Sequence, residues 1–340
     1  PSGYYTRVTS PRGQNTYTWY QAFDQPSYDN PITIWHPAGA RTHITRNVFG
    51  NPTKLRRSNS NNPPGGSLAV DRTYTYNAHQ ELCRQVEPET GATMMGYDGA
   101  GNLAWSASGV ASTIGCDPEG DHPAIASRRV DRSHDARNRI KSLVFPDHRG
   151  DTAYTYTPDS KLASITADNG ATDQVTTRYS YNRRRLMTEE RMLWNNINWP
   201  IKYTYNANGH LNSQRSPAGL VVDYAPNALG QPTMAGSYAS NVSYYPNGAI
   251  KQFTYGNGIV HTMTQNVRRL PERSRDVYGG TAFHDDSYDY DWNGNVAGIS
   301  DALAGHRGDR TLTYDGLDRL TKAVSPMFGT ATYSYDVLDN

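Results

Sequence analysis

The stretch Tyr314-Asp315-Gly316-Leu317-Asp318-Arg319-Leu320 recurs in variant form along most of this chain of 340 residues. Each copy begins at a tyrosine, and most of these tyrosines stand about twenty residues apart. The anchor tyrosines are Tyr76, Tyr97, Tyr156, Tyr181, Tyr205, Tyr224, Tyr245, Tyr290, Tyr314 and Tyr335. Degenerate copies lie near His134 and Gln265. A period in this range marks an array of small supersecondary units that stack on their neighbours, so the sequence predicts a repeat protein.

Each repeat is predicted to form a strand, a turn and a return strand. In Tyr154-Thr155-Tyr156 the tyrosines stand two residues apart, so in a strand both rings point to one face. An Asp or Asn follows, then often a Gly; these residues favour a turn, because Asx side chains bond their own backbone and Gly accepts a positive φ. An apolar residue such as Leu103 or Leu211 opens the return strand. We therefore expect an all-β array of stacked hairpins in a long curved antiparallel sheet, with less than about 10% helix.

Composition agrees with a folded array and argues against several functions. Aliphatic residues are few, but the formal charge is only +1 and the 25 tyrosines can supply buried ring surface. No apolar run approaches the roughly 18 residues that cross a bilayer, so no membrane span is predicted. With a pI near 8.2 and no basic stripe on one face, nucleic-acid binding is not expected.

The period predicts one continuous array over residues 1–340. Within it we assign degenerate repeats to 1–56, a surface loop to 57–67, repeats to 68–105, an irregular insertion to 106–130 and regular repeats to 131–340. Residue 1 is Pro and Asn340 falls inside the turn of a repeat, so we expect a processed or excised piece of a longer protein. Cut ends would expose unpaired strands, which predicts self-association through the sheet edges or pairing with the remaining repeats of the parent chain.

Tyr-Asp-x-x-Gly-Asn/Arg-Leu at these intervals resembles the YD repeats of bacterial Rhs proteins, which also occur in the B and C components of Tc toxins and in teneurins. The resemblance covers at least residues 74–340. It implies a long β-sheet that spirals into a hollow shell, commonly around a C-terminal toxin domain. It also implies a bacterial protein that is secreted or lies on the cell surface.

Few residues suggest chemistry. The self-cleavage phrase of the Rhs family, Asp-Pro-x-Gly-Leu, is matched only by Asp117-Pro118-Glu119-Gly120, which Asp121 follows in place of Leu, so no autoproteolytic residue is assigned. The densest acidic group is Asp285, Asp286, Asp289 and Asp291. In a strand Asp289 and Asp291 would share a face and could hold calcium or act as an acid/base pair. A solvated edge that discourages aggregation is the interpretation we favour.

The two cysteines and the exposed aromatic residues leave alternatives open. Cys83 lies on a return strand and Cys116 in the insertion about one repeat further on, so they form either a disulfide or two free thiols. Trp194, Trp199 and Trp292 could stack on sugar rings, although a place in a core between sheet layers fits the repeats better. No metal and no cofactor is predicted.

Three functional classes remain. The first, which we favour, is a non-catalytic structural shell segment of a toxin or exported surface protein that encloses or presents a C-terminal effector. The second is an adhesive or glycan-binding module. The third is a polysaccharide-degrading enzyme, for which the sequence offers only the aspartates at 285–291.

Overall fold

The computed structural model describes residues 4–22, 28–59, 68–170, 173–303, 305 and 307–336. It contains two compact units, one formed by residues 1–71 with 232–340 and the other by residues 72–231. Of the segment predicted as a surface loop, Arg57 and Ser58 belong to a strand, and residues 60–67 lie outside the described residues.

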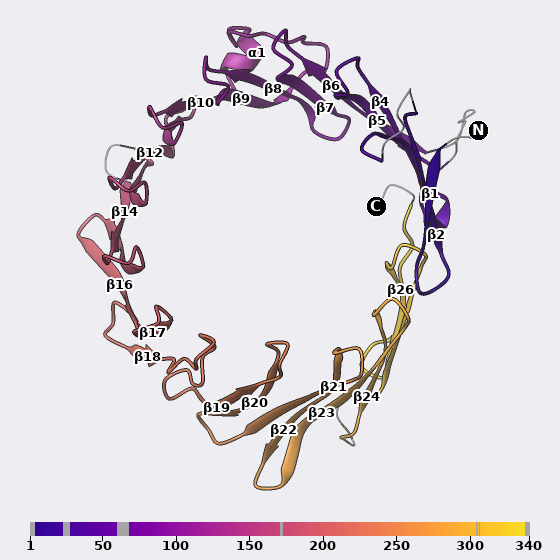
Figure 1. The fold of residues 1–340 in the computed structure, drawn as a ribbon, viewed down its shortest axis with the longest axis vertical. Coiled ribbons are helices and arrows are strands. Elements are labelled where there is room, and N and C mark those ends of the chain that lie inside the picture. Colours follow the sequence, from indigo (N-terminus) through magenta and orange to yellow (C-terminus); the bar gives the residue numbers. More distant parts are fainter. Residues whose placement is uncertain are drawn as a thin grey trace. The chain divides into compact units, whose positions relative to one another are not determined.

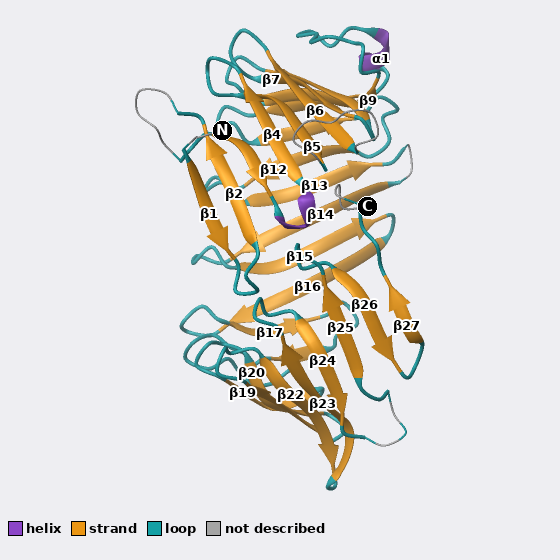
Figure 2. Cartoon of the chain, turned by 90° about the vertical axis from the view of Figure 1, so that its right-hand side faces the viewer, coloured by secondary structure: helices purple, strands orange, loops and turns teal. Residues whose placement is uncertain are grey.

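The prediction of an almost entirely β chain is confirmed, because 55% of the residues are in strands and 2% in helices. Strands fill both units, and within the described residues helix is confined to a 3-10 turn, η1 (Pro37–Gly39), and α1 (Pro123–Ala126) (Figure 2). The described strands form one sheet of eighteen, β1–β18, and one of nine, β19–β27. No described helix is long and apolar enough to cross a membrane.

The first sheet contains β1 Tyr5–Thr9, β2 Asn15–Tyr20, β3 Pro31–Trp35, β4 Arg41–Arg46, β5 Pro52–Ser58, β6 Ala69–Tyr76, β7 Leu82–Glu87, β8 Gly91–Tyr97, β9 Leu103–Val110, β10 Arg129–His134, β11 Ile140–Val144, β12 Asp151–Tyr156, β13 Leu162–Asp168, β14 Gln174–Tyr181, β15 Met187–Trp194, β16 Ile197–Tyr205, β17 Leu211–Arg215 and β18 Val221–Asp223. The second contains β19 Ala239–Tyr244, β20 Ile250–Tyr255, β21 Val260–Gln265, β22 Pro271–Tyr278, β23 Thr281–Tyr290, β24 Val296–Asp301, β25 Arg310–Tyr314, β26 Leu320–Ser325 and β27 Gly329–Thr332.

Strands follow one another in chain order and pair antiparallel with their neighbours (Figure 1). In the β12–β13 hairpin, Tyr154 lies opposite Ile165, and a bulge just before Tyr156 places that ring opposite Leu162. The same bulge precedes the tyrosine in the hairpins that end at Tyr181, Tyr205 and Tyr314. Because strand direction alternates, the repeat turns gather at one margin of each sheet and the loops between repeats at the other.

Most repeat turns are closed by an Asp or Asn, whose place we call position 0; in many copies it directly follows the tyrosine. In the turn after Tyr97, Oδ1 of Asp98 accepts hydrogen bonds from the amides of Ala100 and Asn102, both at 2.9 Å. The residues that make the same two bonds elsewhere are Asn47, Asn77, Asp135, Asn182, Asn206, Asn227, Asn266, Asp291 and Asp315. Local side-chain chemistry thus fixes the turn, as predicted.

Position 3 of the turn has a left-handed backbone. Gly101 has φ +78° there, but Gln80, Arg185 and Asp318 adopt φ between 60° and 64° at the same position. An L side chain costs roughly 1–2 kcal/mol in this conformation. The side-chain bonds from position 0 are therefore strong enough to hold residues other than glycine in the turn.

The tyrosine hydroxyl links many of the repeats to the one before, whereas Tyr224 bonds to the side chain of Gln214 and Tyr245 to the carbonyl of Met263 in the following repeat. Tyr156 donates to the carbonyl of Ile140 at 2.7 Å, and Ile140 is the first residue of the preceding return strand, at position 5. The equivalent bonds are Tyr97 to Leu82, Tyr181 to Leu162, Tyr205 to Met187, Tyr314 to Val296 and Tyr335 to Leu320, at 2.6–3.0 Å. Partial burial raises the pKa of Tyr181, Tyr205 and Tyr314, so these hydroxyls remain protonated donors at neutral pH.

A compact hydrophobic core lies under the predicted insertion. β9 continues to Val110 and β10 begins at Arg129, so the irregular part spans 111–128. Ile125 of α1 is fully buried against Met94 and Trp105. A disulfide joins Cys83 to Cys116 with a Cα–Cα distance of 5.6 Å and ties this segment to β7.

Replacing Tyr156 by Phe should lower the free energy of unfolding by about 1 kcal/mol, because the ring stays and only the bond to Ile140 is lost. Tyr154→Phe is the matched control: Tyr154 is also half-buried, and its hydroxyl has no hydrogen bond among the described residues. Urea unfolding curves of the two variants measure the difference. Equal losses would contradict a role for the hydroxyl bond.

Gly101→Ala should destabilise the protein by about 1 kcal/mol, because alanine is strained at φ +78°. Gly99→Ala, in the same turn, has open space around the added Cβ and no left-handed φ, so it should change stability by less than about 0.5 kcal/mol. Thermal unfolding of both variants tests this, and a neutral Gly101→Ala would show that the turn relaxes.

Candidate functional site

The site with the densest polar contacts between distant segments joins the first hairpin to two repeat turns near residue 300. The turns are 291–295, between β23 and β24, and 315–319, between β25 and β26. The partner is the turn 10–14 between β1 and β2, whose tip is Pro11-Arg12-Gly13. All three segments belong to the same compact unit.

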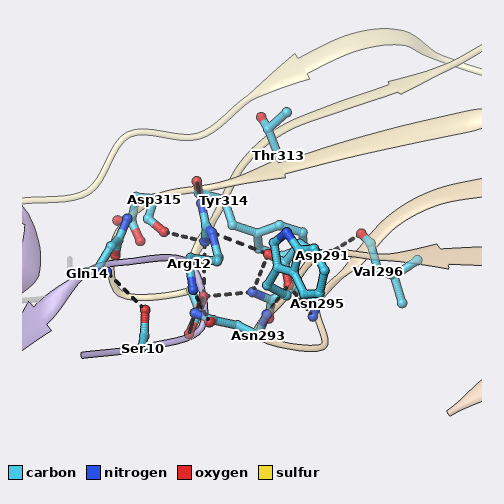
Figure 3. A network of polar contacts seen from close by, with 12 residues as sticks. Ser10, Arg12, Gln14, Asp291, Asn293, Asn295, Val296, Thr313, Tyr314 and Asp315 are labelled. Atoms are coloured by element: carbon cyan, nitrogen blue, oxygen red, sulfur yellow. Dashed lines mark hydrogen bonds and ion pairs between the residues drawn. The ribbon is translucent and has the colours of Figure 1, made fainter. Parts of the chain in front are cut away.

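Arg12 makes most of the contacts, and we call these surroundings the Arg12 site (Figure 3). Its guanidinium donates to the carbonyls of Asp315 at 2.9 Å and Tyr314 at 3.1 Å. It also donates to Oδ1 of Asp318 at 3.1 Å, and its Nε lies 3.5 Å from Oδ2 of Asp291. The backbone amide of Arg12 donates to Oδ1 of Asn293 at 3.1 Å. One cation is thus held by carbonyls and by carboxylates from both turns.

The surrounding groups prepare the site for a cation. The amide groups of Asn293 and Asn295 donate to the carboxylate of Asp318 at 2.7–3.1 Å. These bonds, first that of Asn293, together with Arg12 keep the pKa of Asp318 below its usual value. Its carboxylate is therefore charged at neutral pH. Such a site binds and orients a guanidinium.

A glycine lies where the two segments approach most closely. A Cβ added at Gly316 would lie 2.7 Å from Oε1 of Gln14 and 3.1 Å from Cβ of Pro37. Because real Cβ atoms do not approach other atoms within 3.0 Å, a side chain here would require the Gln14 side chain to move and Pro37 to shift slightly. Gly316 therefore serves the contact, and it has no left-handed φ.

Elsewhere in the array an arginine at position 2 bridges neighbouring turns. Arg137 donates to the carbonyl of Pro158 at 3.0 Å, and Arg184 to that of Ala207 at 2.8 Å. Arg268 donates to the carbonyls of Asp291 and Trp292 at 2.7 and 3.0 Å. Turn 291–295 has Asn293 at position 2 instead, and Arg12 supplies the missing guanidinium from the first hairpin.

Arg12 was not predicted from the sequence. A lone arginine in a Pro-Arg-Gly turn is an ordinary surface feature, and its partners lie about 280 to 306 residues away along the chain. One signal was available, because Asn293 stands where other turns carry an arginine. That position could be recognised only after the bridging role of Arg137, Arg184 and Arg268 was known.

The acidic group predicted as a solvated edge is placed differently. The side chains of Asp285 and Asp286 are only 5% and 3% exposed, so that interpretation is wrong for both. Asp285 is ion-paired with Arg273 and Arg275. Asp286 is ion-paired on the other face with Arg307 and Arg310. The reason is non-local, because these arginines come from neighbouring segments of the sheet.

Asp289 and Asp291 do not share a strand face. β23 ends at Tyr290, a bulge precedes that residue, and Asp291 closes the following turn. Within the described ranges, no group of three or more His, Cys, Asp or Glu residues is arranged to hold a metal ion. The four aspartates thus divide into two buried residues that each pair with two arginines, one strand residue and one turn residue.

Ser274, His284 and Asp286 have the residue types of a nucleophilic triad but the wrong proton arrangement. His284 Nε2 lies 3.2 Å from Ser274 Oγ, and Arg307 donates to His284 Nδ1 at 2.7 Å. Because arginine only donates, Nδ1 accepts and the proton of a neutral ring is on Nε2. Nε2 then donates to Ser274, and in this arrangement it does not accept the proton of that hydroxyl.

The remaining predicted residues lie apart from this site. The structure has Cys83 and Cys116 as a disulfide pair rather than free thiols. Asp117 accepts a hydrogen bond from the amide of His122, within the insertion. Trp194, Trp199 and Trp292 are 39%, 51% and 74% exposed, so the interpretation that places them in a core is wrong. Trp194 and Trp199 lie at the β15–β16 hairpin end and Trp292 in a turn, where no second layer covers them.

No protein-family model and no curated protein matches the sequence. Solved structures do share the fold. The chain is similar to one in TcdB2-TccC3-Cdc42, with a TM-score of 0.58 and 12% identity over 96% of this chain and 21% of that chain. The similarity to a chain in TcdB2-TccC3 has a TM-score of 0.58 and 12% identity over 96% of this chain and 22% of that chain. For a chain in the Tc holotoxin pore of Photorhabdus luminescens, the TM-score is 0.62 and the identity is 13%, over 98% of this chain and 20% of that chain.

This chain spans about a fifth of the length of those Tc toxin chains. Identities this low show a shared fold. They confirm at the level of fold the resemblance to YD-repeat chains that the sequence indicated.

Arg12→Gln should detach the first hairpin from turns 291–295 and 315–319, because the fork of hydrogen bonds and both ion pairs are lost. Bonds to charged groups contribute about 1.5–3 kcal/mol each, so amide exchange in residues 10–14 and 315–319 should accelerate at least tenfold. Raised ionic strength should weaken the wild-type contact in the same direction.

Arg7→Gln is the matched control, because Arg7 is exposed on β1 and has no side-chain bond within the described residues. Its exchange rates should equal those of the wild type. Unchanged exchange in Arg12→Gln would mean that the turns do not hold the hairpin in solution.

Proposed function

We propose that this chain is a non-catalytic structural segment of a toxin-related β-repeat shell that encloses or presents an effector. The observation that carries the proposal is the fold match to Tc toxin chains, which extends over 96–98% of this chain. The wall of a shell needs links between neighbouring repeats. In this segment the tyrosine hydroxyl bonds and the arginine bridges supply such links. A shell of this kind would act outside the cell that makes it, either secreted or on its surface.

Two observations support a non-catalytic role. The buried aspartates are neutralised by arginines, and the proton arrangement around His284 leaves Ser274 without a base. An enzyme would instead need convergent carboxylates or an activated nucleophile in a cleft. Degradation of polysaccharides is accordingly the weakest of the three functions.

The test is protection of a cargo. The protein is expressed from its full-length gene, and the segment encoded after the repeats is followed during limited proteolysis, with the same segment expressed alone as control. A shell predicts that the segment is cleaved much more slowly within the full chain. Equal cleavage rates would overturn the proposal.

Glycan binding is a second candidate because Trp194 and Trp199 are exposed at one hairpin end. A polysaccharide array probed with the wild type and with Trp194→Ala/Trp199→Ala separates the two functions. Binding that disappears in the double variant would favour an adhesive module. The shell proposal expects no binding by either protein.

A further inference from the structure

A cavity in the second compact unit is the open counterpart of the Arg12 site. It lies between the consecutive repeat turns 77–81 and 98–102 and has a volume of about 520 Å³. One side is formed by Tyr97, Asp98 and Gly99, and the other side by Pro118 and Glu119 of the insertion. We call it the 77–98 cavity. Its size is within the roughly 300–1,000 Å³ that small ligands occupy.

Both sites have the same place in the repeat. Turns 77–81 and 98–102 are consecutive, as are turns 291–295 and 315–319, and all four are closed by position 0 in the same way. Tyr97 and Asp98 therefore correspond to Tyr314 and Asp315, whose carbonyls accept from Arg12. The acceptors that hold a guanidinium in one unit are thus repeated beside the cavity in the other.

The cavity lacks a bridging arginine of its own. Position 2 of turn 77–81 is His79, and its ring makes no hydrogen bond in the described part of the chain. Arg137, Arg184 and Arg268 occupy this position in turns that reach their neighbours. Gly99 has no atom within 4 Å of an added Cβ, whereas the equivalent Gly316 is covered by Gln14 and Pro37. The surface that the first hairpin covers at one site is bare at the other.

Charge around the cavity favours a cation. Glu81, Asp98 and Glu119 line it, so the cavity carries carboxylates, as the Arg12 site does with Asp291 and Asp318, although they come from other positions of the turns. The side chain of Glu119 has no partner among the described residues, and Glu81 accepts one bond, from Asn77 at 2.7 Å. The nearby guanidinium of Arg129 is already held by Asp131 and by the carbonyl of Glu119.

From this equivalence we propose that the 77–98 cavity is a docking site for an arginine carried at the tip of a β-turn of another repeat segment. The incoming guanidinium donates to the carbonyls of Tyr97 and Asp98 and pairs with Glu81 and Glu119. Arginine fits better than lysine, because its planar fork bonds two acceptors at once and carries its charge into contact with carboxylates. The inference stands whether or not the chain encloses a cargo.

The test uses a blocked peptide with the sequence of residues 10–14, Ser-Pro-Arg-Gly-Gln, and versions with Lys or Gln in place of Arg. Amide exchange of the intact protein is followed at residues 77–81 and 98–102 as each peptide is added. The Arg peptide should slow exchange there severalfold, the Lys peptide should bind about tenfold more weakly, and the Gln peptide should have no effect. Glu81→Gln/Glu119→Gln should abolish the protection.

A gain-of-function variant keeps the proposal testable if the peptide binds too weakly to detect. His79→Arg places a guanidinium at position 2, where it should reach the carbonyls of Asp98 and Gly99 as Arg184 reaches Ala207. It should slow exchange in 98–102 without peptide and block the Arg peptide, whereas His79→Gln should do neither. The proposal is overturned if neither the Arg peptide nor the His79→Arg substitution slows amide exchange. It is also overturned if all three peptides slow exchange equally.

Discussion

The hydrogen bond from a repeat tyrosine to the carbonyl at position 5 of the preceding repeat, as in the pairs Tyr156–Ile140 and Tyr205–Met187, is the interaction on which this structure depends. A sheet with one small core cannot draw its stability from aliphatic burial, and only eight apolar side chains of the described residues are buried. The tyrosine supplies ring surface and a directed bond in one side chain. The bulge just before it sets the ring opposite the return strand, so turn geometry and inter-repeat linkage are fixed together.

Arginine side chains make a second kind of link between neighbouring repeats, at the turns. Every tight turn presents backbone carbonyls at a margin of the sheet. Neighbouring turns hold together where these carbonyls accept hydrogen bonds from a side chain of the next turn. Arg137, Arg184 and Arg268 do this within the array, and Arg12 does it from a distant hairpin.

The hairpins were predictable because their causes are local. Tyr154, Tyr156 and the Asx residue after each tyrosine contain the strand face and the turn in a few consecutive positions. The buried state of Asp286 was not predictable, because Arg307 and Arg310 approach it only once β23, β24 and β25 are assembled. The Arg12 site was not predictable for the same reason, because its partners lie even further away along the sequence. At Gln80 and Arg185 local bonds outweigh local propensity: hydrogen bonds from position 0 hold these residues at a left-handed φ, which their side chains disfavour.

Differences between repeats therefore carry more functional information than their similarity. Positions 0 and 5 and the tyrosine must be kept for the hairpin to form, so they are similar whatever the segment does. Position 2 is free of that constraint, and it separates turns that bridge to a neighbour through arginine from turns that cannot, such as those with His79 or Asn293. At Asn293 a distant hairpin fills the gap, and at His79 the insertion leaves an acidic cavity open. The places where an array of near-identical units can recognise something else are the turns in which the internal link is missing.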